Sequence, residues 1–426
     1  MAHRAMSRRS MAVAAFSTIV EWYDFTLYLY LATVLSRVFF GGGAASLVDI
    51  LAGFALAYLM RPLGAVVFGH IGDRYGRRRT MLLSMAIMTG AMLATALLPT
   101  YADIGALAGW LLLGLRCLMA FSVGGEYTGV VAYLMEGAEA GRRGLVTSSA
   151  SAASEIGGLL AVGVAAATVT SMNGSMLDAW GWRIPFFVGA ALAGAVLLIR
   201  STMEESPEFR AQQARGTVPC NPLSQMLRLH RGAIGRGFAI SALGSITYYV
   251  GISYVPAFLT SVGAMEEGNS LWLSTIAAVA VILVTPLVGL LSDRVGRRPV
   301  LVGVAVASAI LPILFFMLMA GGLFWHALAG AVLLACLGGA VSAVGAVATA
   351  EQFPGEGRLS GLALGATTAT AIFGGVTPWA AHVLIARTGW PLVPGVMIAV
   401  VAICVLPVLW GLRETAPGRA PAKPSS

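Results

Sequence analysis

Twelve long apolar runs dominate the sequence, and only short polar stretches separate them. A helix needs about 20 mostly apolar residues to cross the hydrocarbon core of a bilayer, and the runs have roughly that length or more. They cover residues 12–40, 48–70, 80–99, 104–134, 145–170, 184–201, 234–262, 271–292, 300–320, 324–349, 360–387 and 392–412. The alternating ten-residue segments of a membrane β-barrel do not occur in the sequence. The runs therefore predict an all-α membrane protein with twelve transmembrane helices.

The composition supports lipid as the main solvent of these helices. Only 11% of the 426 residues are charged, whereas an ordinary soluble domain carries roughly a quarter. So few charges cannot cover a water-facing surface, which excludes a soluble enzyme, a disordered protein and a secreted disulfide scaffold. The first run is too long for a signal peptide and lacks a cleavage site, so we expect it to be retained. The four cysteines lie far apart and indicate neither a metal site nor a disulfide framework.

The distribution of basic residues predicts the orientation of the helices. In membrane proteins Lys and Arg are in excess on the cytoplasmic side. Of the 27 basic residues, 22 lie on one side, at the N-terminus or around the segments that follow runs 2, 4, 6, 8, 10 and 12. The opposite ends of the runs hold three, Arg37, Arg183 and Arg387. Both termini are therefore expected in the cytoplasm.

The chain also repeats itself. GHIGDRYGRRRTMLL at 69–83, after the second run, matches GLLSDRVGRRPVLVG at 289–303, after the eighth, with an offset of 220 residues. A weaker pair, EGAEAGRRG at 136–144 and EQFPGEGRLSG at 351–361, follows the fourth and tenth runs. Such an internal repeat predicts two related halves. The expected parts are a six-helix bundle at 1–201, a cytoplasmic linker at 202–233, a second six-helix bundle at 234–412 and a short cytoplasmic tail at 413–426.

With twelve runs and a duplicated D-R-x-G-R-R motif, the sequence resembles the major facilitator superfamily. Its metabolite:proton symporter branch is similar along nearly the whole chain, through EWYDF at 21–25, RPLGAVVFGHIGDRYGRR at 61–78, FSVGGEYTG at 121–129, WGWRIPFF at 180–187 and EESPEF at 204–209. Members of that branch carry citrate, 2-oxoglutarate, shikimate and related carboxylates, or proline and glycine betaine. FSVGGEYTG favours the osmolyte carriers, whereas TATAIFGGVTP at 368–378 favours the citrate-like carriers. The resemblance implies alternating access by rocking of the two halves around a midplane site.

Ionisable side chains inside a bilayer are costly, so each one within a run is a functional candidate. In symporters of the superfamily an acid in the first span commonly pairs with an arginine in the fourth, which the resemblance places at Asp24 and Arg116. An ionised Asp24 would hold Arg116. Protonation of Asp24 would release the arginine for a substrate carboxylate, which a guanidinium binds through two parallel hydrogen bonds. A permanent structural ion pair is the alternative.

Glu21 and Glu126 are further candidates for the proton. Glu21 lies about 60° from Asp24 on the helical wheel and one turn nearer the cytoplasm. Its alternative role is to reach the membrane interface. Glu126 lies ~15 Å deeper than Arg116 at 1.5 Å per residue, so it need not touch the same substrate molecule. Its alternative is a structural acid paired with Arg61 or with a backbone dipole.

Polar and aromatic side chains complete the expected substrate site. Ser151 and Glu155 form a polar stripe on a helix of small residues. The hydroxyls of Tyr248 and Tyr249 suit carboxylate oxygens, and their rings suit a quaternary ammonium through cation–π attraction. Plain helix packing is the alternative for the serine, and a membrane-interface belt is the alternative for the tyrosines. The expected substrate-binding residues are Arg116, Tyr28, Tyr127, Ser151, Glu155, Tyr248 and Tyr249.

The duplicated loops lie too close to the cytoplasm to reach the substrate, and we expect them to form an inner gate. The aspartate of each loop can cap a helix N-terminus and pair with an arginine. The expected partners of those arginines are Glu136 and Glu351, at the inner ends of runs 4 and 10. Positive charge retained only for topology is the alternative. The gate residues are Asp73, Arg74, Arg77, Glu136, Asp293, Arg294, Arg297 and Glu351.

The sequence thus predicts a proton-coupled secondary transporter that imports a small organic acid such as a di- or tricarboxylate. The alternatives are a proline or glycine betaine:proton symporter, a uniporter and a non-transporting membrane sensor. No nucleotide-binding motif occurs, so we expect no enzyme activity, no cofactor and no metal. The expected partners are a carboxylate or zwitterion, protons and membrane lipid, without nucleic acid, and the expected state is a monomer. Arginine-rich, lysine-poor usage indicates a GC-rich bacterial genome and the inner membrane as the location.

Overall fold

The computed structural model of the protein describes residues 7–42, 53, 56–263, 265 and 267–416. Within these residues every regular element is a helix. This follows from the solvent, because lipid cannot hydrogen-bond exposed backbone groups and a helix satisfies its own. The first part of the run expected at 48–70 lies outside the described residues.

The N-terminal half supplies the first six spans. Two spans are broken, the first at Leu31 and the fourth at Gly124–Gly125. The elements are α1 (Arg8–Tyr30), α2 (Ala32–Phe40), α4 (Met60–Tyr75), α5 (Arg77–Ala96), α6 (Tyr101–Ile104), α7 (Leu107–Val123), α8 (Glu126–Gly137), η1 (Ala140–Arg142), α9 (Arg143–Ser171), α10 (Gly174–Met176), η2 (Leu177–Gly181) and α11 (Arg183–Arg200).

Two short linker helices, α12 (Pro207–Arg215) and α13 (Pro222–Leu229), lead to the C-terminal half. Its seventh span is bent by 44° and its eleventh is broken where the sequence GGVTPW interrupts the helix. The elements are α14 (Arg231–Tyr248), η3 (Tyr249–Ser253), α15 (Val255–Ser261), α16 (Glu267–Val295), α17 (Arg297–Ala320), α18 (Phe324–Ala350), η4 (Gly355–Gly357), α19 (Arg358–Leu362), η5 (Ala363–Thr367), α20 (Thr368–Phe373), α21 (Thr377–Thr388) and α22 (Val393–Trp410).

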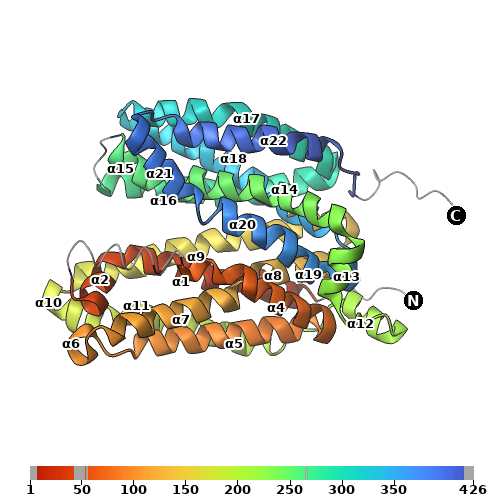
Figure 1. Ribbon diagram of the computed structural model, residues 1–426, viewed down its shortest axis with the longest axis horizontal. Coiled ribbons are helices and arrows are strands. Elements are labelled where there is room, and N and C mark those ends of the chain that lie inside the picture. The colour runs from red at the N-terminus through yellow and green to blue at the C-terminus, as the bar shows by residue number, and fades with distance from the viewer. Residues whose placement is uncertain (1–6, 43–52, 54–55, 264, 266, 417–426) are drawn as a thin grey trace.

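The helices confirm the twelve-span architecture. Among the described residues nine helices are long and apolar enough to cross a membrane, and the bent seventh span makes ten. The broken first span, α1 with α2, and the span that ends in α4 complete the set. Figure 1 shows two bundles lying side by side, the N-terminal half in red to yellow and the C-terminal half in green to blue. The start of α1, the end of α22 and the linker helices all lie at one end of the molecule (Figure 1). The basic residues predict that this end is cytoplasmic, and we refer to it as the cytoplasmic end.

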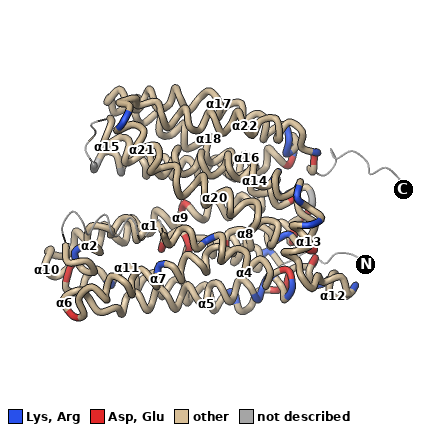
Figure 2. The backbone as a smooth tube through the Cα atoms, in the orientation of Figure 1, with Lys and Arg blue, Asp and Glu red and all other residues tan. Residues whose placement is uncertain are grey.

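Each bundle has its own apolar core. In the N-terminal half the core contains Phe39, Met88, Trp182 and Phe186, and in the C-terminal half Phe258 and Phe316 stack edge to face. A further apolar cluster joins the halves near the cytoplasmic end, where Met135 packs with residues of α14, α18 and α19. Charged residues gather at that end and, along the middle of the bundles, mainly in the N-terminal half (Figure 2). The polar chemistry of the interior therefore belongs mostly to the first six spans.

Candidate functional site: a cavity between the two halves

A cavity of about 180 Å³ lies between the two halves. α1, α4, α8 and α9 line it from the N-terminal half, and α14, η3, α18, η5 and α20 line it from the C-terminal half. Most of its polar lining consists of hydroxyl groups. These come from Tyr58, Tyr127, Thr128, Ser151, Ser154, Ser241, Ser245, Tyr248, Tyr249, Ser342, Thr349, Thr367 and Thr370. We refer to this space as the central cavity.

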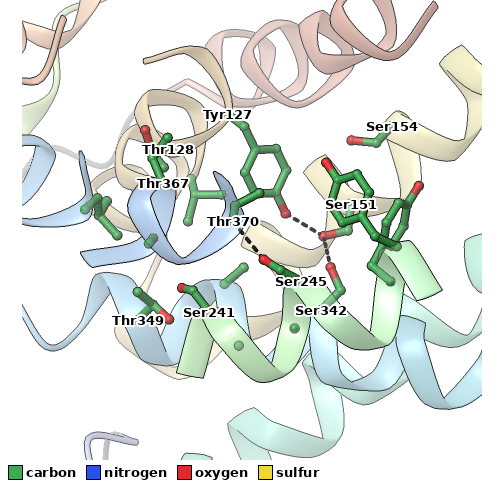
Figure 3. Close-up of a pocket in the computed structure, with 18 of the residues that line it drawn as sticks. Tyr127, Thr128, Ser151, Ser154, Ser241, Ser245, Ser342, Thr349, Thr367 and Thr370 are labelled. Carbon is green, nitrogen blue, oxygen red and sulfur yellow. Dashed lines mark hydrogen bonds between the residues drawn. The ribbon is translucent and has the colours of Figure 1, made fainter. Parts of the chain in front are cut away.

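A chain of hydroxyls crosses the central cavity from one half to the other. The Tyr127 hydroxyl lies 2.9 Å from the Ser151 Oγ, which lies 3.3 Å from the Ser342 Oγ of α18. Figure 3 shows these three side chains pointing toward one another. Within the C-terminal half, Ser245 of α14 and Thr370 of α20 share a hydrogen bond of 2.9 Å (Figure 3). Hydroxyls both donate and accept, so this lining can adapt to carboxylate, hydroxyl or amine groups.

Four aromatic side chains and one acid form a second connection between the halves. The Tyr248 hydroxyl donates to Glu155 Oε1 at 2.7 Å, and the Tyr58 and Tyr249 hydroxyls lie 2.5 Å apart. The ring of Trp22 meets that of Tyr248 edge on at 5.3 Å. The two adjacent tyrosines sit where α14 passes into the π-helical turn η3, and the wider turn places both rings on the cavity.

Arg61 is the cation of the central cavity. Its guanidinium lies 3.5 Å from Glu21 and 4.8 Å from the centre of the Tyr58 ring. Close packing of α4 against the break between α7 and α8 fixes its backbone, because a Cβ on Gly124 would collide with the Arg61 carbonyl oxygen. The second oxygen of Glu21, Oε2, is buried and has no hydrogen-bond partner. The Glu21–Arg61 pair is therefore loosely held.

A smaller cavity of about 40 Å³ lies beside the central one, entirely within the N-terminal half. Glu21 and Arg61 line both cavities. Asp24 binds Arg116 there through two hydrogen bonds of 2.7 and 3.0 Å, and the Arg116 guanidinium stacks over the Tyr28 ring at 5.1 Å. The ion pair implied by the resemblance is thus present. Arg116 and Tyr28, expected as substrate-binding residues, line this side cavity and not the central one.

Glu126 has different partners from those expected. It is fully buried, and it pairs with Arg200 at the end of α11 and accepts a hydrogen bond from Ser84. Arg200 also donates to Ser17 and to the Met81 carbonyl. The suggested pairing of Glu126 with Arg61 is wrong, because Arg61 pairs with Glu21. Arg200, at the end of the sixth run, is an interior residue.

The two repeated aspartates fasten the halves together at the cytoplasmic end. Asp73 of α4 accepts hydrogen bonds from the backbone N–H groups of Leu359 and Ser360, at the start of α19, at 3.2 and 2.8 Å. Asp293 of α16 accepts from Gly144 and Leu145, at the start of α9, at 2.8 and 2.9 Å. Each aspartate therefore caps a helix of the other half. We call these two contacts the reciprocal caps.

Arginines strengthen both reciprocal caps. Arg77 lies 3.3 Å from Asp73 and 3.1 Å from Glu136, and Arg297 lies 2.8 Å from Asp293 and 3.3 Å from Glu351. On the first side the network continues across the halves, because Arg358 binds both Glu136, at 2.7 Å, and Glu208 of linker helix α12, at 2.6 Å. Arg74 and Arg294, also expected at the gate, are exposed. Arg74 donates only a 3.3 Å bond to the Cys220 carbonyl.

Two further glutamates cap the helices that follow the repeated motif. Glu205 accepts from the backbone N–H groups of Arg77 and Arg78, and Glu414 accepts from those of Arg297 and Arg298. Gly76 and Gly296 precede these helices with φ of 110° and 117°, and a Cβ on either would collide with the capping carboxylate. Burial opposes ionisation of Glu414. The backbone N–H groups of Ala416, Arg297, Arg298 and Thr415 nevertheless hold its pKa below the ordinary value.

The central cavity contains residues that the sequence did not single out. Arg61 was visible as an ionisable residue within a run, but its place beside Glu21 depends on helix packing. Tyr58 and Ser342 carried no signal, because an isolated hydroxyl in an apolar run is common. Within the described residues no group of three or more His, Cys, Asp or Glu side chains is placed to hold a metal ion.

Known proteins are similar to this chain in sequence and in architecture. Residues 10–221 match the family described as sugar (and other) transporter, and residues 264–426 match the major facilitator superfamily. The glycine betaine/proline/ectoine/pipecolic acid transporter OusA of Dickeya dadantii is 31% identical over 96% of this chain and 84% of its own length. The citrate-proton symporter of Klebsiella pneumoniae is 32% identical over 91% of this chain and 87% of its own.

A solved structure shows the same fold. The proton:xylose symporter XylE bound to 6-bromo-6-deoxy-D-glucose superposes with a TM-score of 0.80 at 19% identity, over 96% of both chains. The twelve-span architecture, the duplicated inner motif and these whole-length likenesses agree with one another. The chain belongs to the major facilitator superfamily of transporters, in its branch of metabolite:proton symporters.

Proposed function

We propose that this protein imports a small metabolite bearing a carboxylate group together with a proton. One observation carries the proposal: two carboxylate–arginine pairs, Glu21–Arg61 and Asp24–Arg116, line one side cavity, and the first of them also faces the central cavity. The two acids are three residues apart on α1. They thus offer a proton site directly beside the cation that faces the substrate.

Coupling follows from the shared arginine. While Glu21 is ionised it neutralises Arg61, and a substrate carboxylate would have to displace it. Protonation of Glu21 leaves Arg61 without its counter-charge in a poorly solvated place, so binding of a carboxylate becomes favourable. Proton and substrate therefore stabilise each other's binding. Thermodynamic linkage requires that each changes the affinity for the other by the same factor. Asp24 is the second acid, from which Arg116 is released in the same way.

Alternating access uses the inner gate. The reciprocal caps and their arginines close the cytoplasmic end, so substrate released inward must first break them. The central cavity lies between the halves, and rocking one half against the other opens it to one side at a time. The proposed location is the inner membrane of a bacterium, and the proposed unit is the monomer with its surrounding lipid.

The nature of the substrate rests on the relatives and on the cavity. The sequence favoured a di- or tricarboxylate, with proline or glycine betaine as the alternative. The relatives' names include citrate on one side and betaine, proline and ectoine on the other. A carboxylate is common to these compounds, and Arg61 is its proposed partner.

The test is proton uptake by proteoliposomes that hold the purified protein, followed with an external pH electrode. Citrate, tricarballylate, 2-oxoglutarate, shikimate, proline and glycine betaine are added singly. We expect external alkalinisation with at least one of them, abolished in Glu21→Gln, Asp24→Asn and Arg61→Ala. Glu139→Gln, a matched change at an exposed cytoplasmic loop, serves as the control. Uptake of tracer without proton movement in the wild type would show a uniporter and refute the proposal.

A further inference from the structure

The charges of the central cavity set a limit on its substrate. Among the described residues that line it, the ionisable charges are two acids, Glu21 and Glu155, and one arginine, Arg61. Arg61 already forms an ion pair with Glu21, at 3.5 Å. A buried charge without a partner is costly, and the surrounding bilayer makes it more so. The cavity can therefore neutralise one negative charge of a substrate, and only when Glu21 is protonated.

This limit disfavours di- and tricarboxylates. The second and third carboxylates of such a substrate would lie in the same cavity as Glu155, supported by neutral donors, namely the hydroxyl groups and the indole N–H of Trp22. Hydroxyls stabilise a carboxylate less than a guanidinium does, because charged pairs form stronger hydrogen bonds. Arg116 cannot supply the missing charge in this arrangement, since Asp24 holds it with two hydrogen bonds in the side cavity.

Glu155 gives the cavity a place for a positive charge. The carboxylate accepts one hydrogen bond, from the Tyr248 hydroxyl at 2.7 Å, and no ion pair involves it among the described residues. It is 7% exposed and faces the cavity from α9. A substrate cation there would remove the cost of the unpaired acid.

Aromatic rings lie next to this acid. The rings of Tyr248 and Tyr249 meet edge on at 5.4 Å, and that of Trp22 lies 5.3 Å from that of Tyr248. All three line the central cavity. Aromatic faces attract quaternary and other organic ammonium groups through their quadrupoles. The acid and the rings therefore provide two kinds of attraction for the same group.

We infer that the substrate is a zwitterion, whose carboxylate binds Arg61 and whose organic ammonium group binds near Glu155 and the rings of Trp22, Tyr248 and Tyr249. This inference rests on the proposed proton symport. With Glu21 protonated, the two charges of the zwitterion pair with the two remaining charges of the cavity, and no net charge is left. The aromatic rings favour ammonium nitrogens that carry methyl groups or belong to a ring over a primary amine.

The test compares ligands that differ only in the cation. Glycine betaine and 3,3-dimethylbutyrate have the same shape, but a carbon replaces the positive nitrogen in the second. The pair 4-(trimethylammonio)butyrate and 5,5-dimethylhexanoate repeats the comparison with a longer spacing between the charges. Competition against labelled glycine betaine or proline on the purified protein gives the four affinities. We expect the better zwitterion to bind at least about tenfold more tightly than its carbon analogue.

The variant Glu155→Gln separates a cation site from a proton site. If Glu155 binds the substrate cation, the variant weakens binding of the zwitterions and leaves binding of the carbon analogues nearly unchanged. The ratio of the zwitterion's affinity to that of its carbon analogue then falls toward one. If Glu155 instead carries the proton, binding of all four ligands weakens together and the affinity ratio persists, which overturns the inference. Glu139→Gln is the control, and thermal unfolding of each variant verifies that it is folded.

Proton-coupled uptake keeps this inference distinguishable from the proposed function. Alkalinisation with citrate or 2-oxoglutarate, and none with proline, glycine betaine or 4-(trimethylammonio)butyrate, would leave the symporter proposal standing and overturn the zwitterion. Uptake of a zwitterion without a proton would refute the symporter while the affinity ratio still supports the cation site. Uptake of a zwitterion with a proton, and loss of the ratio in Glu155→Gln, supports both.

Discussion

At the scale of single residues, the interior acids differ in what surrounds them. Asp24 and Glu21 face cavities with their arginine partners, whereas Glu126 is fully buried against Arg200 and Ser84 and lines neither cavity. A carboxylate that must gain and lose a proton needs a path to water. Enclosure of this kind is typical of a structural ion pair that holds α8 against α11.

Glu126→Gln is therefore expected to destabilise the protein more than it alters coupling. The change leaves the Arg200 guanidinium buried without a counter-charge, which typically costs about 3–5 kcal/mol. Thermal unfolding in detergent measures the loss. Removal of both charges in Glu126→Gln/Arg200→Gln should recover part of it. A stable Glu126→Gln variant that accumulates no substrate would contradict this assignment and return Glu126 to the proton pathway.

At the scale of helices, the inner gate depends on N-terminal caps. An acid that accepts from the first backbone N–H groups of a helix also interacts favourably with its dipole. Asp73 and Asp293 do so across the two halves, at 2.8–3.2 Å. Loss of either carboxylate weakens the closed cytoplasmic end without removing any residue of the central cavity.

Asp73→Asn/Asp293→Asn should shift the protein toward an inward-open state. Spin labels at Arg142 and Arg413, both exposed and on different halves, report the separation of the cytoplasmic ends in a cysteine-free background. In double electron–electron resonance measurements, we expect the population with a longer distance between the two labels to grow. Asp103→Asn, an exposed acid in α6 at the opposite end, should leave the distances as they are. Unchanged distances in the double variant would show that the caps do not control closure.

The cap at the start of α17 has a pH dependence with a defined sign. The pKa of Glu414 is lower in the folded protein than its ordinary value, so its stabilising effect is complete above the ordinary value. That effect is lost as the pH falls through the lower, folded value. Wild type and Glu414→Gln should therefore differ in unfolding temperature by a constant amount near neutral pH, and the difference should shrink in acid. A difference that grows in acid would contradict the cap.

At the scale of the whole molecule, transport requires the halves to separate across the hydroxyl chain. The Ser151 and Ser342 oxygens are 3.3 Å apart on different halves. Cysteines at both positions should form a disulfide on oxidation, because side chains this close place their Cβ atoms near the required range. We expect transport by Ser151→Cys/Ser342→Cys to stop on oxidation and return on reduction in the same sample. Transport that persists after complete cross-linking would exclude rocking of the halves at this level.

Sequence reasoning reached the architecture because its signals are local. Run length gives the spans, and the repeat around Asp73 and Asp293 gives the two halves, whereas the orientation from arginine placement stays a prediction. It also brought Asp24 and Arg116 together, through the resemblance. It assigned the wrong partner to Glu126 and did not place Arg61 on the substrate cavity. Both depend on which face of one helix meets another, and in a helix that is apolar all round no periodicity marks that face.

The reciprocal caps have a consequence for the origin of the fold. Each half carries both partners of the contact, the aspartate after its second span and the helix N-terminus after its fourth, with Asp73 and Asp293 in equivalent positions. A contact in which each side offers the same two elements is isologous, and it closes on itself under two-fold symmetry. Two separate copies of one six-helix ancestor could therefore have formed this same gate as a dimer. Fusion of the gene copies would then have fixed the pairing and freed the interiors to diverge, which left nearly all the buried acids in one half.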